Sequence, residues 1–128
     1  MSIRVAGGQL RGRILKTVPG MVTRPTTGRV REAIFSILQH DLDGADVLDI
    51  FAGSGALAIE ALSRGAGSAV LIEKGRQAVS VIKQNLEKCE LTARLITTDY
   101  QKGLGILLAE KKQFDLIFAD PPYELITP

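Results

Sequence analysis

The alternation of short apolar runs with longer amphipathic segments, from residue 46 onward, constrains the fold of this chain most strongly. The runs have the length of strands, and the segments have the length of helices. In chain order, the alternating elements are predicted at 46–51, 56–63, 69–72, 76–88, 93–97, 104–111 and 114–119. Strands that alternate with helices form a parallel sheet covered on both faces, so we predict an α/β fold with a doubly wound sheet. Ligands bind such sheets beside the carboxyl ends of the strands.

The first 40 residues follow a different pattern. Residues 3–6 and 12–17 are short strand candidates, and the glycines between them favour a hairpin. A loop rich in Pro and Gly follows. The next segment predicts a helix that ends near residue 40 and carries one apolar face, formed by Val30, Ile34, Ile37 and Leu38. We therefore expect two parts: a small N-terminal extension of hairpin and helix over residues 1–40, and an α/β core over residues 41–128.

Charge is distributed unevenly along the chain. Residues 1–31 contain seven Lys or Arg and no acidic residue, whereas the remainder contains nine basic and fourteen acidic residues. A basic segment attached to a mildly acidic body indicates an anionic partner, with nucleic acid as the first candidate. A solvated basic surface without a partner explains the charge equally well.

Cysteine and histidine are scarce, with one of each in the chain. A disulfide framework is therefore excluded, and no metal ligand set is visible in the sequence. The N-terminus lacks the apolar region of a signal peptide, and no apolar run approaches the roughly 20 residues that span a bilayer. We expect a cytoplasmic protein with neither a metal nor a membrane partner.

The segment from Asp49 to Gly55 follows the first strand of the predicted core and opens a helix. Its glycines allow a sharp turn and close approach of a ligand, and the helix amides favour a negative group. Glu73 lies at the end of the next strand, where a carboxylate can bind the hydroxyls of a ribose. The glycine pattern also fits a dinucleotide fingerprint. Asp49 can face an ammonium group, which favours S-adenosylmethionine over NAD.

The most specific motif is Asp120-Pro121-Pro122-Tyr123, directly after the last predicted strand. An exocyclic amine of a base is a poor nucleophile because its lone pair is delocalised into the ring. The Asp120 carboxylate and the Pro121 carbonyl can accept hydrogen bonds from such an amine and aim its lone pair at a methyl donor. The prolines restrict the backbone, and Tyr123 offers a ring on which an extruded base can stack. The structural alternative is a strand terminator followed by a surface tyrosine.

These two motifs together resemble those of class I amino-methyltransferases. Three longer segments, 23–35, 47–57 and 59–66, are similar to the RsmD family. The resemblance implies a Rossmann-like class I methyltransferase core with S-adenosylmethionine as cofactor. It also implies methylation of the 2-amino group of a guanine in 16S ribosomal RNA, within an assembling small subunit.

The resemblance further implies roles for individual residues. The cofactor would contact Asp49, Phe51, Gly53, Gly55, Glu73 at the ribose and Asp99 at the adenine edge. The target amine would contact Asp120, Pro121, Pro122 and Tyr123. The RNA would contact Arg11, Arg13, Lys16, Arg24, Arg29 and Arg31. Alternatively, Asp99 caps the following helix, and Arg24 serves the cofactor pocket.

The predicted core has four strands, whereas the fold of the family continues with three more. We therefore expect a C-terminally truncated sheet, in a fragment of a longer protein with reduced or no activity. Two other functions fit the same motifs: a DNA adenine-N6 or cytosine-N4 methyltransferase, and an RNA-binding or assembly module without catalysis. A nicotinamide-dependent dehydrogenase is disfavoured because no hydride-relay His or Tyr-Lys pair is evident.

Overall fold

A computed structural model describes residues 2–20 and 27–120 of the chain. Its elements, in chain order, are β1 (Ser2–Arg4), β2 (Ile14–Lys16), α1 (Thr27–Leu38), β3 (Asp46–Asp49), α2 (Ala56–Ser63), β4 (Ser68–Ile72), α3 (Arg76–Lys88), β5 (Arg94–Ile96), α4 (Tyr100–Ala109) and β6 (Leu116–Phe118). Every predicted strand and helix is present. The largest difference is at the start of α4, which begins at Tyr100 because Asp99 caps it.

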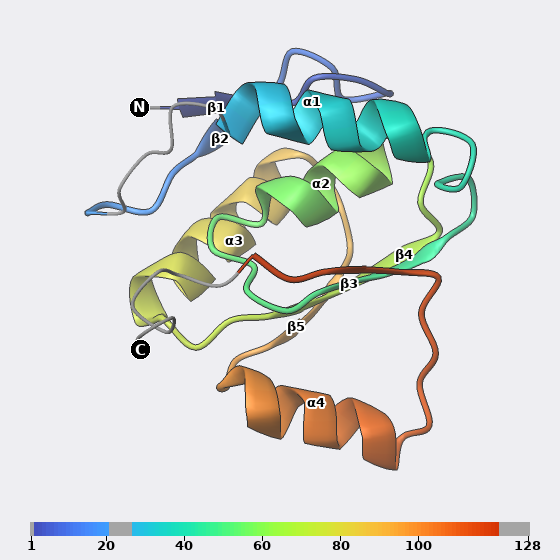
Figure 1. Ribbon diagram of the computed structural model, residues 1–128. Coiled ribbons are helices and arrows are strands. Elements are labelled where there is room, and N and C mark those ends of the chain that lie inside the picture. The colour runs from blue at the N-terminus through green and yellow to red at the C-terminus, as the bar shows by residue number, and fades with distance from the viewer. Residues whose placement is uncertain (1, 21–26, 121–128) are drawn as a thin grey trace, which may run out of the picture.

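Strands β3 to β6 form one parallel sheet in the order β5-β4-β3-β6. Strand β3 therefore lies between the strand that follows it in sequence and the last described strand, and the direction of the strand order reverses there. Helices α1, α2 and α3 lie on one face of the sheet, and α4 lies on the other (Figure 1). The predicted doubly wound α/β fold is confirmed. The carboxyl ends of all four strands share one edge, with β3 at the switch point.

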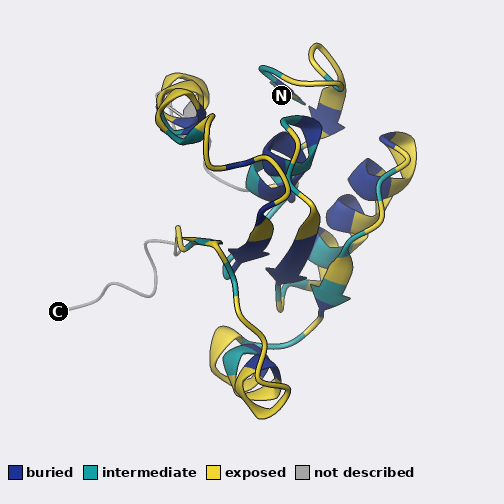
Figure 2. Ribbon diagram, turned by 90° about the vertical axis from the view of Figure 1, so that its right-hand side faces the viewer, coloured by how far each residue is buried: buried dark blue, intermediate teal, exposed yellow. Residues whose placement is uncertain are grey.

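Each face of the sheet has its own hydrophobic core. On the face with three helices, Val47 of β3 and Leu71 of β4 are fully buried. On the opposite face, Leu48 of β3 packs with Ile72 and with Leu107 of α4. Neighbouring residues in a strand point to opposite faces, so a run such as Val47-Leu48 must be apolar throughout. Figure 2 shows the buried strands at the centre and exposed residues on the outer sides of the helices.

The N-terminal hairpin packs onto the core rather than extending from it. Strands β1 and β2 are antiparallel, with Ile3 opposite Leu15. Val5 and Leu15 are only 2% and 1% exposed, and they belong to the same hydrophobic cluster as Ile59 of α2 and Ile82 of α3. The hairpin is thus part of the molecule's main core. The division at residue 40 remains a prediction about domain organisation.

The buried face of α1 differs from the one predicted. Val30 is 49% exposed and Ile37 is 78% exposed, whereas Arg31 and Phe35 are buried. The ring of Phe35 lies 5.6 Å from the ring of Phe118 of β6. Ile34 and Leu38 of the predicted face are half-buried, and Leu38 packs against the core. The prediction was wrong for Val30 and Ile37, because the core-facing side is centred on Phe35 and includes a buried arginine.

No helix within the described residues has both the length and the apolar character that a membrane span requires.

Candidate cofactor site at the carboxyl edge of the sheet

The glycine-containing turn after β3 begins the candidate site. Gly53 has a φ of 59° and Gly55 a φ of 83°, both in the left-handed region that favours glycine. Gly55 is the N-cap of α2, so the turn brings the amino end of this helix beside the end of β3. The Ala52 amide donates to the Ile72 carbonyl of β4 at 3.1 Å. The turn is therefore attached to the neighbouring strand before any ligand binds.

Glu73, the residue directly after β4, holds this turn from the side. Its Oε1 accepts a hydrogen bond from the Gly53 amide at 2.8 Å, and its Oε2 accepts one from the Gly75 amide at 2.9 Å. A carboxylate oxygen can accept more than one hydrogen bond, so both oxygens retain capacity for hydroxyl groups. Glu73 thus orders the turn and still offers acceptors at the sheet edge.

Asp49, the last residue of β3, is 1% exposed, and neither of its carboxylate oxygens has a hydrogen-bond partner among the described residues. Burial, followed by the negative charges of Glu73 and Asp120, raises its pKa from 3.8 to about 7. The nearby Phe51 amide opposes this shift. A buried carboxylate without a donor is costly. The arrangement is therefore suited to a cationic ligand.

Asp120 follows β6, which pairs with β3. The Ile50 amide donates to the Phe118 carbonyl at 2.9 Å, so the chain beyond β6 leaves the sheet beside the end of β3. Asp120 is exposed and close enough to Asp49 to raise the pKa of that carboxyl. The predicted target-amine residues Pro121, Pro122 and Tyr123 lie outside the described residues.

At the end of β5, Asp99 is the N-cap of α4, and its Oδ1 accepts a hydrogen bond from the Lys102 amide at 2.9 Å. The capping alternative is therefore confirmed, and a contact with adenine through Oδ2 stays a prediction. The next residue, Tyr100, was not predicted as a site residue. Its ring centroid lies 5.1 Å from that of Phe51, at an interplanar angle of 50°. Its position next to Asp99, where the segment after β5 leads into α4, was the signal in the sequence that could have identified it.

The predicted RNA-binding residues lie in different environments. Arg11 and Arg29 are exposed. Arg13 donates to the Lys88 carbonyl at 3.3 Å, and the Lys16 ammonium donates to Gln84 at 2.8 Å, so both side chains lie against α3 while remaining exposed. Arg24 lies outside the described residues.

Arg31 was predicted to contact RNA, and this prediction requires a correction because the side chain is buried. It is 7% exposed, and its guanidinium donates to the Arg4 carbonyl at 3.0 Å. Its Nε lies 3.7 Å from a carboxylate oxygen of Glu60, which is itself 1% exposed. A buried cation paired with a buried carboxylate is committed within the protein. We therefore exclude Arg31 from the candidate RNA surface.

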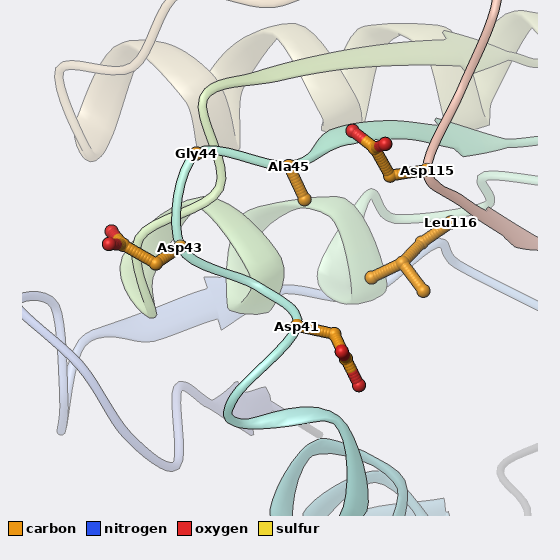
Figure 3. Close-up of a pocket in the computed structure, with 6 residues that line it drawn as sticks. All are labelled: Asp41, Asp43, Gly44, Ala45, Asp115 and Leu116. Carbon is orange, nitrogen blue, oxygen red and sulfur yellow. The ribbon is translucent and has the colours of Figure 1, made fainter.

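A pocket at the opposite edge of the sheet does not belong to this site. Asp41, Asp43 and Asp115 line it together with Gly44, Ala45 and Leu116, at the amino ends of β3 and β6. The three carboxylates do not converge on a common point (Figure 3). Asp115 already accepts a hydrogen bond from the Asp46 amide at 2.8 Å. No group of His, Cys, Asp or Glu suited to hold a metal ion occurs in the described parts of the chain.

Comparisons with a family model and with individual relatives all indicate the same protein family. A model of the family described as conserved hypothetical protein 95 matches residues 3–127. YlbH of Bacillus subtilis is 42% identical over 124 residues, which cover 95% of this chain and 67% of that protein. The ribosomal RNA small subunit methyltransferase D of Escherichia coli is 40% identical over 122 residues, covering 94% of this chain and 60% of that protein.

A solved structure shares the fold described above. The structure of yhhF from Escherichia coli superposes with a TM-score of 0.82 and 44% sequence identity, covering 95% of this chain and 66% of that one. The chain spans about two thirds or less of the length of these relatives.

Proposed function

The chain belongs to the RsmD family, and from this premise we propose that it acts in the S-adenosylmethionine-dependent methylation of ribosomal RNA. The observation that carries the proposal is the buried Asp49 carboxylate, which has only the nearby Phe51 amide to stabilise its charge and faces the charges of Glu73 and Asp120. A dinucleotide would bring two phosphates into this negative region, whereas S-adenosylmethionine brings an ammonium and a sulfonium. The electrostatics of the site therefore favour the sulfonium cofactor.

The chemistry of the residues at this edge suits the proposed cofactor. Asp49 would accept hydrogen bonds from the ammonium group, and Glu73 would accept them from the ribose hydroxyls. Phe51, Tyr100 and the second oxygen of Asp99 are the candidates for contact with the adenine. When bound, the cofactor supplies an electrophilic methyl group. The contribution of the chain is to bind and orient it at the edge where Asp120 lies.

The acceptor that we propose is the 2-amino group of a guanine in 16S ribosomal RNA. The relative in Escherichia coli is named for the small ribosomal subunit, which supports a small-subunit substrate. Asp120, as the first residue of the motif Asp120 to Tyr123, would accept a hydrogen bond from the amine and favour a more pyramidal nitrogen. Pro121 and Pro122 would fix the backbone, and Tyr123 would stack on the base.

The RNA surface that we propose is the exposed basic part of the N-terminal region. Among the predicted residues, Arg11, Arg13, Lys16 and Arg29 are exposed, and Arg24 is an additional candidate. Structured RNA is bound largely through phosphates and shape, for which exposed cations suffice. With ribosomal RNA as the substrate, the place of action is the cytoplasm.

The first test is calorimetric titration with S-adenosylhomocysteine, the product form of the cofactor. The wild-type chain should bind it, and Asp49→Asn should weaken binding about 10- to 100-fold through loss of a charged hydrogen bond. Asp41→Asn, at the opposite edge of the sheet, is the matched control and should bind as the wild type does. Failure of the folded wild-type chain to bind would contradict the cofactor assignment.

The second test separates the possible substrates. Methyl incorporation is measured with small ribosomal subunits, with free 16S RNA and with duplex DNA. Preference for the ribosomal substrates supports the proposal, and preference for DNA would replace it with an adenine or cytosine amino-methyltransferase. RNA binding without any methyl transfer, unchanged by Asp120→Ala, would indicate an RNA-binding or assembly module.

A further inference from the structure

Asn85 connects the N-terminal hairpin to the glycine-containing turn. It lies on α3 and is 1% exposed. Its Oδ1 accepts a hydrogen bond from the Lys16 amide at 2.8 Å, and its Nδ2 donates to the Lys16 carbonyl at 3.0 Å and to the Ser54 carbonyl at 2.9 Å. One side-chain amide therefore joins three segments that are far apart in the sequence.

The orientation of this amide is set by its partners. Lys16 presents an N–H donor, which requires the oxygen of Asn85, whereas the two carbonyls require its nitrogen. A flipped amide would place a donor against a donor and an oxygen against two oxygens. Towards Lys16, the side chain acts as a neighbouring β-strand would, by pairing with both backbone groups of one residue. Of the two orientations of the amide, only this one satisfies all three partners.

The contact with Ser54 acts on the backbone that forms the start of α2. The Ser54 carbonyl and the Gly55 amide belong to one planar peptide unit. Asn85 holds the carbonyl of this unit, and the Ala52 carbonyl accepts from its amide at 2.8 Å. Both ends of the peptide are thus fixed. The direction of the amides at the amino end of α2, which would face the cofactor, depends on this fixation.

A second attachment of the hairpin provides a natural comparison. The Ser63 hydroxyl accepts from the Leu10 amide at 2.9 Å and donates to the Gly7 carbonyl at 2.6 Å. This attachment lies at the last residue of α2, a full helix away from the turn. Ser63 therefore secures the hairpin without touching the turn, whereas Asn85 touches both.

We propose that Asn85 is a positioning residue, which holds the Ser54–Gly55 peptide in the geometry that binds the cofactor and couples this geometry to the docked hairpin. The identity of the ligand in this inference rests on the proposed function. The effect of Asn85 on the turn does not depend on that function. Asn85→Asp keeps the shape of the side chain, yet it removes both donors and places an oxygen against two carbonyls. Ser63→Ala removes the hairpin contact alone and is the matched control.

The first measurement needs no ligand: hydrogen exchange of the amides of residues 53–55, with thermal unfolding recorded for each variant. Asn85→Asp should speed exchange of these amides by about tenfold, the factor that corresponds to one lost hydrogen bond. Ser63→Ala should leave them unchanged although it also lowers the unfolding temperature. If Asn85→Asp does not fold, Asn85→Ala, which leaves room for water, replaces it with the same expectation.

The second measurement is titration of each folded variant with S-adenosylhomocysteine. The Asn85 variant should bind it about tenfold more weakly, and Ser63→Ala should bind it as the wild type does. Equal effects of the two variants on exchange and affinity would overturn the inference, because they would reduce Asn85 to general stability. If the wild-type chain does not bind the ligand, the proposed function is contradicted. If Asn85→Asp still speeds exchange in that case, the role of Asn85 in positioning the turn stands.

Discussion

Strands β3 and β6 lie side by side in the sheet, yet the fold supports them to different degrees. Strand β3 pairs with β4 on one side and with β6 on the other. Its Val47 and Leu48 are at most 2% exposed. Strand β6 pairs with β3 and, among the described residues, with no strand on its other side, and its Ile117 is 58% exposed. The end of β3 carries Asp49, and the chain beyond β6 carries Asp120.

This difference separates the two halves of the proposed reaction. The residues for the cofactor follow β3, β4 and β5, where sheet pairing and helix caps fix the backbone before a ligand arrives. Strands β3 and β4 are paired on both sides, and Asp99 after the edge strand β5 is held by its helix cap. The residue for the target amine follows β6, the other edge of the described sheet, where fewer contacts define its position. We therefore expect cofactor binding to be built into this part of the chain, and methyl transfer to depend on more than the described contacts of β6.

The largest expected effect contrasts two residues that pair in register, Leu48 and Ile117. Leu48→Ala should lower the free energy of unfolding by about 2–5 kcal/mol, because it leaves a cavity beneath α4. Ile117→Ala should lower it by less than about 1 kcal/mol, because its side chain is half exposed. Urea unfolding of both variants measures the difference. Equal losses would mean that something covers Ile117 in solution, and the contrast between the strands would disappear.

The next effect concerns catalysis. Asp120→Ala should reduce methyl incorporation into small ribosomal subunits by about 10²- to 10³-fold, because an acceptor for the target amine is lost. The affinity for S-adenosylhomocysteine should change by less than about threefold. Asp115→Ala, at the other end of β6, should leave methyl transfer near that of the wild type. A parallel loss of cofactor affinity in Asp120→Ala would show that the two halves of the site are not separable.

The smallest effect is a pH dependence of cofactor affinity, which we expect from Asp49 at the end of β3. The pKa of Asp49 is raised from 3.8 to about 7 in the ligand-free chain, and a bound ammonium group would lower it. The ionised form binds the cation, so affinity for S-adenosylhomocysteine should rise about tenfold or more from about pH 5.5 to about pH 7.5. Asp49→Asn should bind weakly and show little of this dependence.

The stability of the ligand-free chain should change in the opposite direction. Because the folded carboxyl of Asp49 holds its proton up to a higher pH than the unfolded one, the unfolding free energy falls as pH rises from about 4 through about 7. Asp49→Asn removes this contribution, so its stability should vary less over the same range. Among the described residues, Glu73 and Asp120 are the charged groups that act on Asp49, and both keep its pKa high. An unchanged slope in the variant would assign the pH dependence to other groups.

Local patterns in the sequence predicted the elements because they depend on neighbours a few residues away. The alternation of apolar runs with helical segments predicted the parallel sheet, and the position of Asp49 and Glu73 after consecutive strands predicted that they share an edge. Asp99 was predicted with two possible roles, of which helix capping is confirmed. The motif Asp120 to Tyr123 was identified from its residue types and its position after a predicted strand, and Asp120 does lie near Asp49.

The sequence by itself determined the order of strands and helices, the sharp turn at Gly55 and the acidic residues at the strand ends. Only the tertiary structure decided that Arg31 is buried beside Glu60, that Asn85 joins Lys16 to Ser54, and that Asp49 is buried without a well-formed hydrogen bond among the described residues. The physical reason is distance along the chain. Periodicity reports which residues share a face of one element, whereas burial and polar pairing depend on partners that crossovers bring together from remote segments.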